Sequence, residues 1–153
     1  MLDVSRDRVP TRETLAWLVD VLAGLRFNEL QLYVEHTFAY TGHDEVWRDA
    51  SPLTHDDMAW LARYGADRGV DLVANMNGFG HMGRWLAHEA YRDLAEGPDG
   101  FDAVFGGGRS DPTCLAPTPA NAELAVALAR EMLTAVGGRR VHIGGDEPFE
   151  LGE

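Results

Sequence analysis

Apolar and polar residues alternate in two ways along this chain, in short strand-like runs and in longer stripes of helical period. Strand-like runs are predicted at residues 1–5, 28–35, 70–75 and from 140 to the glycine pair at 144–145. Between them, apolar side chains recur three and four residues apart, which places them on one face of a helix. The first such stripe consists of Leu15, Leu18, Val19 and Leu22.

The predicted helices carry start and stop signals. The candidate N-cap residues are Thr11, Thr54 and Thr118. Thr54 is the best supported, because Asp57 follows three residues later and Leu53 and Met58 have the spacing of a hydrophobic staple. Pro119 stands at the first position of the last helix, where its missing N–H is not needed. Glycines are predicted to end these helices, at Gly24, Gly69 and Gly137–Gly138.

Strands and helices therefore alternate along the chain. A further helical stretch is predicted over 83–96, and a glycine- and proline-rich loop over 97–117. Short apolar strands separated by helices are typical of parallel βα units, in which each helix crosses back over the sheet. The sequence thus predicts an α/β fold with parallel strands in one domain covering residues 1–153.

Composition narrows the range of partners. The formal charge of −12 argues against nucleic acid and against an anionic membrane surface, because both attract basic patches. No apolar run approaches the ~20 residues of a membrane span, and the N-terminus lacks the order of a secretory signal. The single cysteine, Cys114, has no nucleophile motif around it and suits a reducing compartment. We therefore expect a cytoplasmic protein.

Titratable residues follow the carboxyl ends of the predicted strands, where sites lie in parallel α/β folds. They are Asp3, Arg6, Glu35, His36, His81, His142, Asp146 and Glu147. Surface charge scattered at random would not fall repeatedly at the ends of apolar strands. The sequence therefore predicts a site at this edge of the sheet.

Asp146 and Glu147 form the most informative pair in this set. Neighbours on a regular strand point to opposite faces, so both reach one pocket only if the backbone bends. The glycines at 144–145 and Pro148 permit that bend. Two close carboxylates disfavour double ionisation, so one can stay protonated as an acid. The alternative interpretation is a solvated acidic turn.

The two nearby histidines are interpreted differently. His81 lies among glycines at a strand end, as a site residue or as a hydrogen-bonded structural histidine. His142 is expected to be a packed supporting residue beside the acids. These histidines and acids are the residue types that bind zinc, but no histidine pair has metal-ligand spacing on one helix. We therefore predict neither a metal nor a cofactor.

Three segments taken together resemble family 20 glycoside hydrolases, the β-N-acetylhexosaminidases. They are Leu-Asp-Val-Ser-Arg at 2–6, Gly-His at 80–81 and His-Ile-Gly-Gly-Asp-Glu at 142–147. The segments at 31–40 and 79–82 look closest to the hexosaminidase D-like branch. The resemblance covers essentially the whole chain, and it implies the first four βα units of a (β/α)8 TIM barrel.

The resemblance also implies a reaction, the hydrolysis of terminal N-acetylhexosamine from β-glycosides with retention. In this family the substrate's own acetamido oxygen is the nucleophile. Asp146 matches the residue that orients and stabilises the acetamido group, and Glu147 matches the general acid. His81 matches a histidine that supports the acid. Asp3, Arg6, Glu35 and His142 are expected to support the site or to bind substrate.

The chain departs from the family pattern in three ways. The family arginine that binds the sugar hydroxyls lies upstream of Met1, and Glu35-His36 stands where paired aspartates are common. Glu35 is a candidate partner for His81. Four βα units are half a barrel, so we expect little activity from the chain alone, and release of nitrophenol from an aryl N-acetyl-β-glucosaminide only after extension at both ends.

Two other function classes stay open at this point. One is a non-catalytic half-barrel that binds sugar or self-associates through its open sheet edges, which sedimentation would reveal as a stable dimer. The other is a metal-dependent hydrolase on a related barrel, which metal analysis of the purified protein would reveal.

Overall fold

Four strands form a single sheet in the computed structural model, which describes residues 1–6, 8–103 and 106–152. In spatial order they are β1 (Leu2–Asp3), β2 (Glu29–Val34), β3 (Asp71–Met76) and β6 (Val141–His142). Every neighbouring pair is parallel. The parallel βα organisation predicted from the sequence is therefore confirmed, with each strand next to the preceding strand of the same sheet.

The two faces of this sheet differ in character. On β2 the residues at 30, 32 and 34 belong to the hydrophobic core, and on β3 so do those at 72, 74 and 76. Because side chains alternate between faces, the residues between them point to the opposite face. There Asn75 donates to Gln31 over 2.7 Å, and Asn77 donates to the Tyr33 hydroxyl over 3.3 Å. The second face is thus polar.

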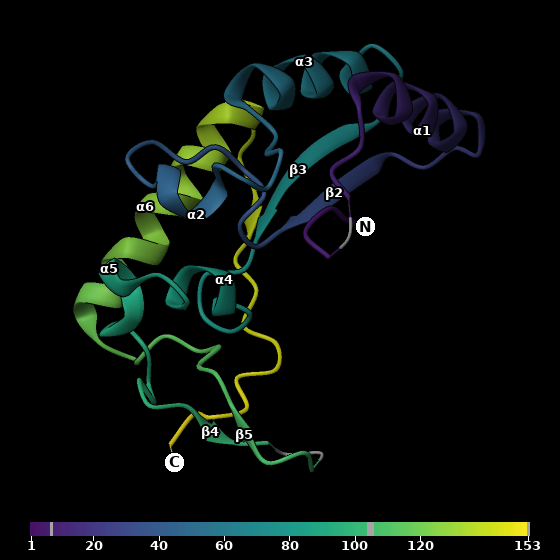
Figure 1. Cartoon of the computed structure of the whole chain (residues 1–153). Helices are drawn as coiled ribbons and strands as arrows, with labels where there is room; N and C mark the ends of the chain where they lie inside the picture. The colour runs from purple at the N-terminus through teal and green to yellow at the C-terminus, as the bar shows by residue number, and fades with distance from the viewer. Residues whose placement is uncertain (7, 104–105, 153) are drawn as a thin grey trace.

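Helices cover the apolar face of the sheet. The helices are α1 (Arg12–Gly24), α2 (Asp44–Trp47), α3 (His55–Ala66), α4 (Gly83–Leu86), α5 (Glu89–Arg92) and α6 (Pro119–Val136). Figure 1 shows α1, α3 and α6 packed along the same side of β2 and β3. No helix in the described part of the chain is long and apolar enough to cross a membrane.

The helix signals read from the sequence have the expected geometry. Thr54 and Asp57 form a capping box, in which the side chain of each accepts from the backbone N–H of the other. Leu53 and Met58 are both buried. Thr118 accepts from the N–H of Asn121 at the start of α6, and Gly137 ends that helix at φ 65°. These local signals are sufficient to place α3 and α6.

Three features differ from the expectations. The stretch predicted as one helix over 83–96 is two single turns, α4 and α5, because His88 between them has extended backbone (ψ 139°). The predicted loop over 97–117 contains a short antiparallel hairpin, β4 (Phe101–Asp102) and β5 (Arg109–Ser110). The turn α2 was not predicted, since four residues are too few to show a helical period.

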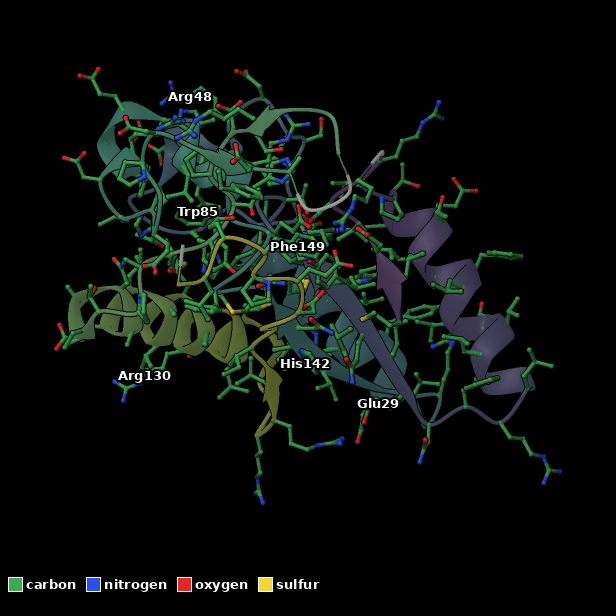
Figure 2. All side chains as sticks on the ribbon, turned by 90° about the horizontal axis from the view of Figure 1, so that it is seen from below. Glu29, Arg48, Trp85, Arg130, His142 and Phe149 are labelled. Carbon is green, nitrogen blue, oxygen red and sulfur yellow. The ribbon has the colours of Figure 1, made fainter. Side chains whose placement is uncertain are left out.

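The core contains one large aromatic group that connects the helices to the sheet. Trp85 of α4 is 1% exposed, and its ring contacts those of Tyr40, His43 and Tyr91. Its indole N–H donates to the backbone oxygen of Glu35 over 2.9 Å. Figure 2 shows Trp85 inside the molecule and Arg130 pointing away from it. The core residue therefore also fixes the backbone at the end of β2.

Two glycines in helices are predicted to respond in opposite ways to replacement by alanine. A Cβ at Gly65 in α3 would lie 2.4 Å from the backbone oxygen of Val70, whereas at Gly24 in α1 it would meet nothing within 4 Å. We expect Gly65→Ala to lower the free energy of unfolding by about 1–3 kcal/mol. We expect Gly24→Ala to raise it by about 0.4–1 kcal/mol, because it restricts the unfolded chain. Urea unfolding of both variants tests the pair, and equal effects would contradict it.

Candidate active site

The predicted site residues gather at the carboxyl end of the sheet, on and above its polar face. Most of the expected residues lie in one cluster, supplied by four strands and the segments that follow them. The cluster consists of Asp3, Arg6, Tyr33, Glu35, Asn77, His81, Asp146 and Glu147.

His81 is the centre of this cluster. Its Nε2 lies 3.3 Å from Oδ2 of Asp146 and 3.2 Å from Oε2 of Glu147. Its Nδ1 lies 3.7 Å from Oε1 of Glu35, within ion-pair range but beyond a normal hydrogen bond. The side chain of His81 is 19% exposed, whereas those of both acids are 57% exposed. The acids therefore face solvent on one side, where a substrate can reach them, and the histidine on the other.

Glu35 is held from several directions. Tyr33 donates its hydroxyl to Oε1 over 3.0 Å, and the Arg6 guanidinium pairs with the same oxygen. Arg6 also lies 3.3 Å from a carboxylate oxygen of Asp3. Burial, together with the charge of Glu35, raises the pKa of Tyr33 to about 12, so its hydroxyl stays protonated and remains a donor. The cation of Arg6 compensates the buried Glu35 carboxylate.

Asn77 fixes the opposite side of the acid pair. Its amide donates to Oδ1 of Asp146 over 3.0 Å and to the Tyr33 hydroxyl over 3.3 Å. Neither Asn77 nor Tyr33 was predicted as a site residue. The signals were present, because Tyr33 precedes Glu35 by two residues on the same face and Asn77 directly follows a buried strand.

The backbone around the acids adopts conformations that few side chains favour. His81 and Glu147, which contact each other, have φ values of 51° and 52°. Residues in this region cost on the order of 1–3 kcal/mol and persist only where surrounding contacts hold them. Gly144 and Gly145, predicted to permit the bend before the acids, have φ values of 75° and 116°.

The segment carrying His81 and the segment carrying the acids are in close backbone contact. A Cβ at Gly80 would lie 2.6 Å from the backbone oxygen of Asp146, and a Cβ at Gly144 would lie 2.6 Å from the Asn77 side chain. Both positions therefore require glycine. This close approach brings His81 within reach of the two carboxylates.

His142 does not join the cluster, so the expectation of a packed supporting residue is wrong. Its side chain is exposed, and its Nδ1 accepts from the N–H of Gly144 over 3.2 Å. The physical reason is its place on β6, which pairs with β3 on one side and has no partner on the other within the described residues. The register places His142 beside Asn75, so its side chain lies on the polar face of the sheet, away from the helices.

Cys114 is buried, and its thiol is not activated as a nucleophile. It is 0% exposed. Burial, with the charges of Glu150 and Glu96, raises the pKa of its thiol to about 12, so the thiol stays neutral near pH 7. In the described part of the chain, no group of three His, Cys, Asp or Glu side chains is arranged to hold a metal ion.

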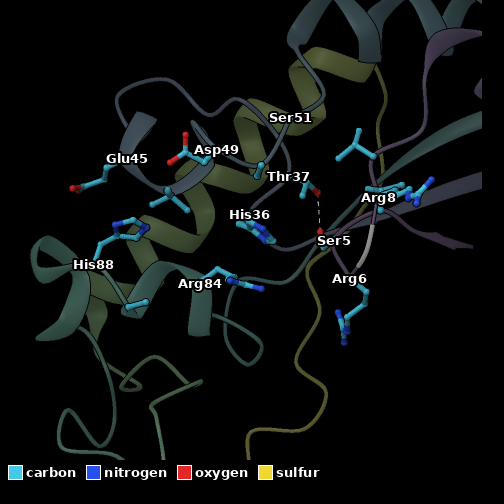
Figure 3. Close-up of a pocket in the computed structure, with 15 residues that line it drawn as sticks. Ser5, Arg6, Arg8, His36, Thr37, Glu45, Asp49, Ser51, Arg84 and His88 are labelled. Carbon is cyan, nitrogen blue, oxygen red and sulfur yellow. Dashed lines mark hydrogen bonds between the residues drawn. The ribbon is translucent and has the colours of Figure 1, made fainter.

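A cavity of about 700 Å³ lies beside the cluster, between the ends of β1 and β2 and α4 (Figure 3). It shares only Arg6 with the cluster. Ser5 and Thr37 line it and are joined by a 2.8 Å hydrogen bond. His36, another strand-end residue, lies here rather than in the cluster, and burial and the charge of Arg84 lower its pKa. Asp146 and Glu147 are not among the residues that line this cavity.

Comparison with known proteins gives a family and a set of solved structures. Residues 1–151 match glycosyl hydrolase family 20, catalytic domain. No curated protein matches the chain. A family 20 β-N-acetylhexosaminidase from Streptomyces coelicolor A3(2) is 22% identical, with a TM-score of 0.74 over 95% of this chain and 32% of that one. The chitobiase of Flavobacterium johnsoniae is 23% identical, with a TM-score of 0.75 over 96% of this chain and 23% of that one.

A third solved structure has bound sugar. It is a mutant β-hexosaminidase of Streptomyces plicatus in complex with the product GlcNAc, 20% identical, with a TM-score of 0.76 over 97% of this chain and 32% of that one. The chain therefore spans about a third or less of the length of these structures. At these identities the likeness shows the fold, and the four parallel strands are half of the strands of a (β/α)8 barrel. The sequence led us to expect four βα units, but among the described residues no helix follows β6, so the structure contains three complete units and a fourth strand.

Proposed function

The chain belongs to glycosyl hydrolase family 20, and we propose that the protein carrying it removes terminal N-acetylhexosamine residues from β-glycosides. The observation that carries this proposal is the contact of His81 Nε2 with both Asp146 and Glu147. It supports a site in which two neighbouring carboxylates have separate roles and share one basic partner. Membership of the hexosaminidase D-like branch and a cytoplasmic location stay predictions.

In the proposed reaction the substrate supplies its own nucleophile. The oxygen of its 2-acetamido group attacks the anomeric carbon, while Glu147 gives its proton to the leaving glycosidic oxygen. The bond to the leaving group breaks and an oxazolinium ion forms. Water then attacks the anomeric carbon while the bond from that carbon to the acetamido oxygen breaks, which restores the 2-acetamido group. The proton of the water passes to the Glu147 carboxylate, and the sugar leaves with retained configuration.

In this scheme Asp146 binds and orients the 2-acetamido group of the substrate. Its Oδ1 accepts from Asn77 over 3.0 Å, and this hydrogen bond fixes the plane of the carboxylate. The exposed part of the carboxylate can then accept the acetamido N–H and stabilise the positive charge that develops on the oxazolinium ring. In this scheme Asp146 acts as a carboxylate and Glu147 as a proton donor, so the two acids have different roles at adjacent positions.

His81 and Glu35 are assigned supporting roles. The Nε2 of His81 is within 3.3 Å of both acids and can exchange a hydrogen bond with either as the proton on Glu147 leaves and returns. Glu35 lies behind His81, held by Tyr33 and Arg6. Asp3 contributes through its contact with Arg6. His142 has no role in this proposal, since its side chain lies outside the cluster.

The experiment uses two substrates that differ in the acetamido group. We expect the gene product that contains these residues to release nitrophenol from 4-nitrophenyl N-acetyl-β-glucosaminide and not from 4-nitrophenyl β-glucoside, because the glucoside lacks the nucleophile. We expect a chelator to leave the rate unchanged. Equal cleavage of both substrates would rule out the substrate-assisted mechanism. A rate that requires added metal would favour the metal-dependent hydrolase.

Self-association is a second proposal, favoured by apolar residues at the two flanks of the sheet. Trp17 and Leu25 of the α1 region are 64% and 65% exposed, and Ile143 after β6 is 61% exposed. Each flank also carries a strand that pairs on one side only among the described residues. We expect the isolated 153-residue chain to sediment as a dimer, and a monodisperse monomer would contradict this.

A further inference from the structure

We propose that Glu150 is a positioning residue that holds Glu147 against His81, through a brace made by residues 113–115. This inference rests on the proposed function, because it assigns Glu147 the role of acid. Glu150 lies three residues after Glu147. It belongs to no motif identified in the sequence, and the proposed reaction does not use it directly.

Glu150 is a buried carboxylate whose acceptors are satisfied. It is 1% exposed. Its Oε1 accepts the backbone N–H groups of Thr113 at 2.7 Å and Cys114 at 2.5 Å, and its Oε2 accepts the Thr113 hydroxyl at 2.8 Å. A buried charged group is tolerated only when such partners replace its water. The contacts therefore tie the segment after the acids to a segment 36 residues earlier in the chain.

The same 113–115 segment also holds the backbone on both sides of His81. The N–H of Met82 donates to the backbone oxygen of Thr113 over 2.8 Å. The N–H of Leu115 donates to the backbone oxygen of Phe79 over 2.9 Å. We call residues 113–115, with these bonds and those to Glu150, the brace. It joins the His81 segment to the Glu147 segment through one short stretch of backbone.

The brace acts on two residues that need such support. His81 and Glu147 both have φ near 50°, a region that non-glycine residues leave readily unless contacts hold them. From Glu147 the chain reaches Glu150 through one tight turn, with the N–H of Phe149 bonded to the oxygen of Glu147 at 2.9 Å. Loss of the Glu150 contacts therefore releases Glu147 from its position opposite His81.

The first arm of the test compares Glu150→Ala, which removes the acceptors, with Glu150→Gln. In the glutamine variant the amide oxygen can accept both N–H groups, and the Thr113 hydroxyl can turn to accept from the amide nitrogen. For an alkyl N-acetyl-β-glucosaminide, whose leaving group needs the acid, we expect Glu150→Ala to lower kcat/KM about 10–100-fold, the scale of an ångström misplacement. We expect Glu150→Gln to retain most of the kcat/KM of the unsubstituted protein. Equal losses in both variants would overturn the positioning role.

The second arm asks whether Glu150 acts through Glu147. For a dinitrophenyl glycoside, whose leaving group departs without protonation, we expect Glu150→Ala to change kcat/KM by less than about threefold. In the double variant Glu147→Gln/Glu150→Ala, the second substitution should lower kcat/KM little further, because the effects of residues that act as one unit are not additive. Equal losses on both substrates, or additive losses, would mean a general loss of structure and overturn the proposal. Glu96→Ala is the matched control, since Glu96 also binds the C-terminal segment, at the N–H of Gly152.

The third arm does not depend on activity, and it separates failure of the brace from failure of the proposed function. Amide hydrogen exchange is measured on the folded protein and on Glu150→Asp, which keeps the charge on a shorter side chain and serves if the alanine variant does not fold. We expect faster exchange at Thr113, Cys114 and Met82, and unchanged exchange in β2 and β3. Unchanged exchange at Met82 would overturn the brace whatever the substrate assays show.

Discussion

Replacing Glu147 by glutamine is expected to lower kcat/KM for an alkyl N-acetyl-β-glucosaminide by about 10²–10⁴-fold, the usual contribution of a positioned general acid. The side chain keeps its size and its place near His81, but it loses the proton that the leaving oxygen must take. The loss should shrink sharply for a dinitrophenyl glycoside, because that leaving group departs as a stable anion. Steady-state kinetics of the gene product on the two substrates measure both values.

Two variants make this result specific. Asp146→Asn should lower the rate for both substrates alike, because attack by the acetamido oxygen is needed whatever the leaving group. Glu123→Gln, on the exposed side of α6, should change neither. If Glu147→Gln lowers kcat/KM equally for both substrates, and the loss in Asp146→Asn depends on the leaving group instead, the two residues have exchanged roles. If neither variant loses activity, the acid pair is not the site.

Replacing Trp85 by alanine is expected to lower the free energy of unfolding by about 3–5 kcal/mol, the range for a buried tryptophan. Its side chain is 1% exposed and contacts three aromatic rings, so truncation leaves a cavity that rigid neighbours fill poorly. It also removes the donor to the backbone oxygen of Glu35. Denaturant unfolding of the 153-residue chain measures the effect.

Trp17 provides the matched control for this prediction. It is the same residue type, lies in α1 and is 64% exposed. We expect Trp17→Ala to change the free energy of unfolding by less than about 0.5 kcal/mol, as at other exposed positions, when unfolding is measured at protein concentrations too low for the proposed dimer to form. Similar losses in the two variants would show that the exposed face of α1 is covered in solution, for example by a second copy of the chain.

Local chemistry was sufficient to predict most of the architecture. A capping box such as that of Thr54 and Asp57 is complete within four residues, and an apolar stripe repeats within two turns, so the sequence displays both directly. The rule that sites lie at the carboxyl ends of parallel strands predicted that Glu35, His81, Asp146 and Glu147 share one site. Alternation on strands then explains why Tyr33 and Glu35 share a face.

The remaining features depend on contacts between distant segments. Asn77 binds Asp146 across 69 residues, and Glu150 binds Thr113 across 37. Nothing near Glu150 in the sequence distinguishes a buried carboxylate from the exposed acids around it. The position of His142 was mispredicted for a related reason, because its exposure depends on the strand beside it and on which face of the sheet the helices cover, and neither can be read from the residues around it.

The contact between His81 and the two acids lies between neighbouring strands, β3 and β6. The three groups that contact one another therefore belong to one continuous stretch of chain, residues 81–147. Under the proposed function, a chimeric barrel joined after this stretch would keep both acids in contact with His81. Recombination at this boundary is thus expected to preserve the acid pair whatever sequence follows it.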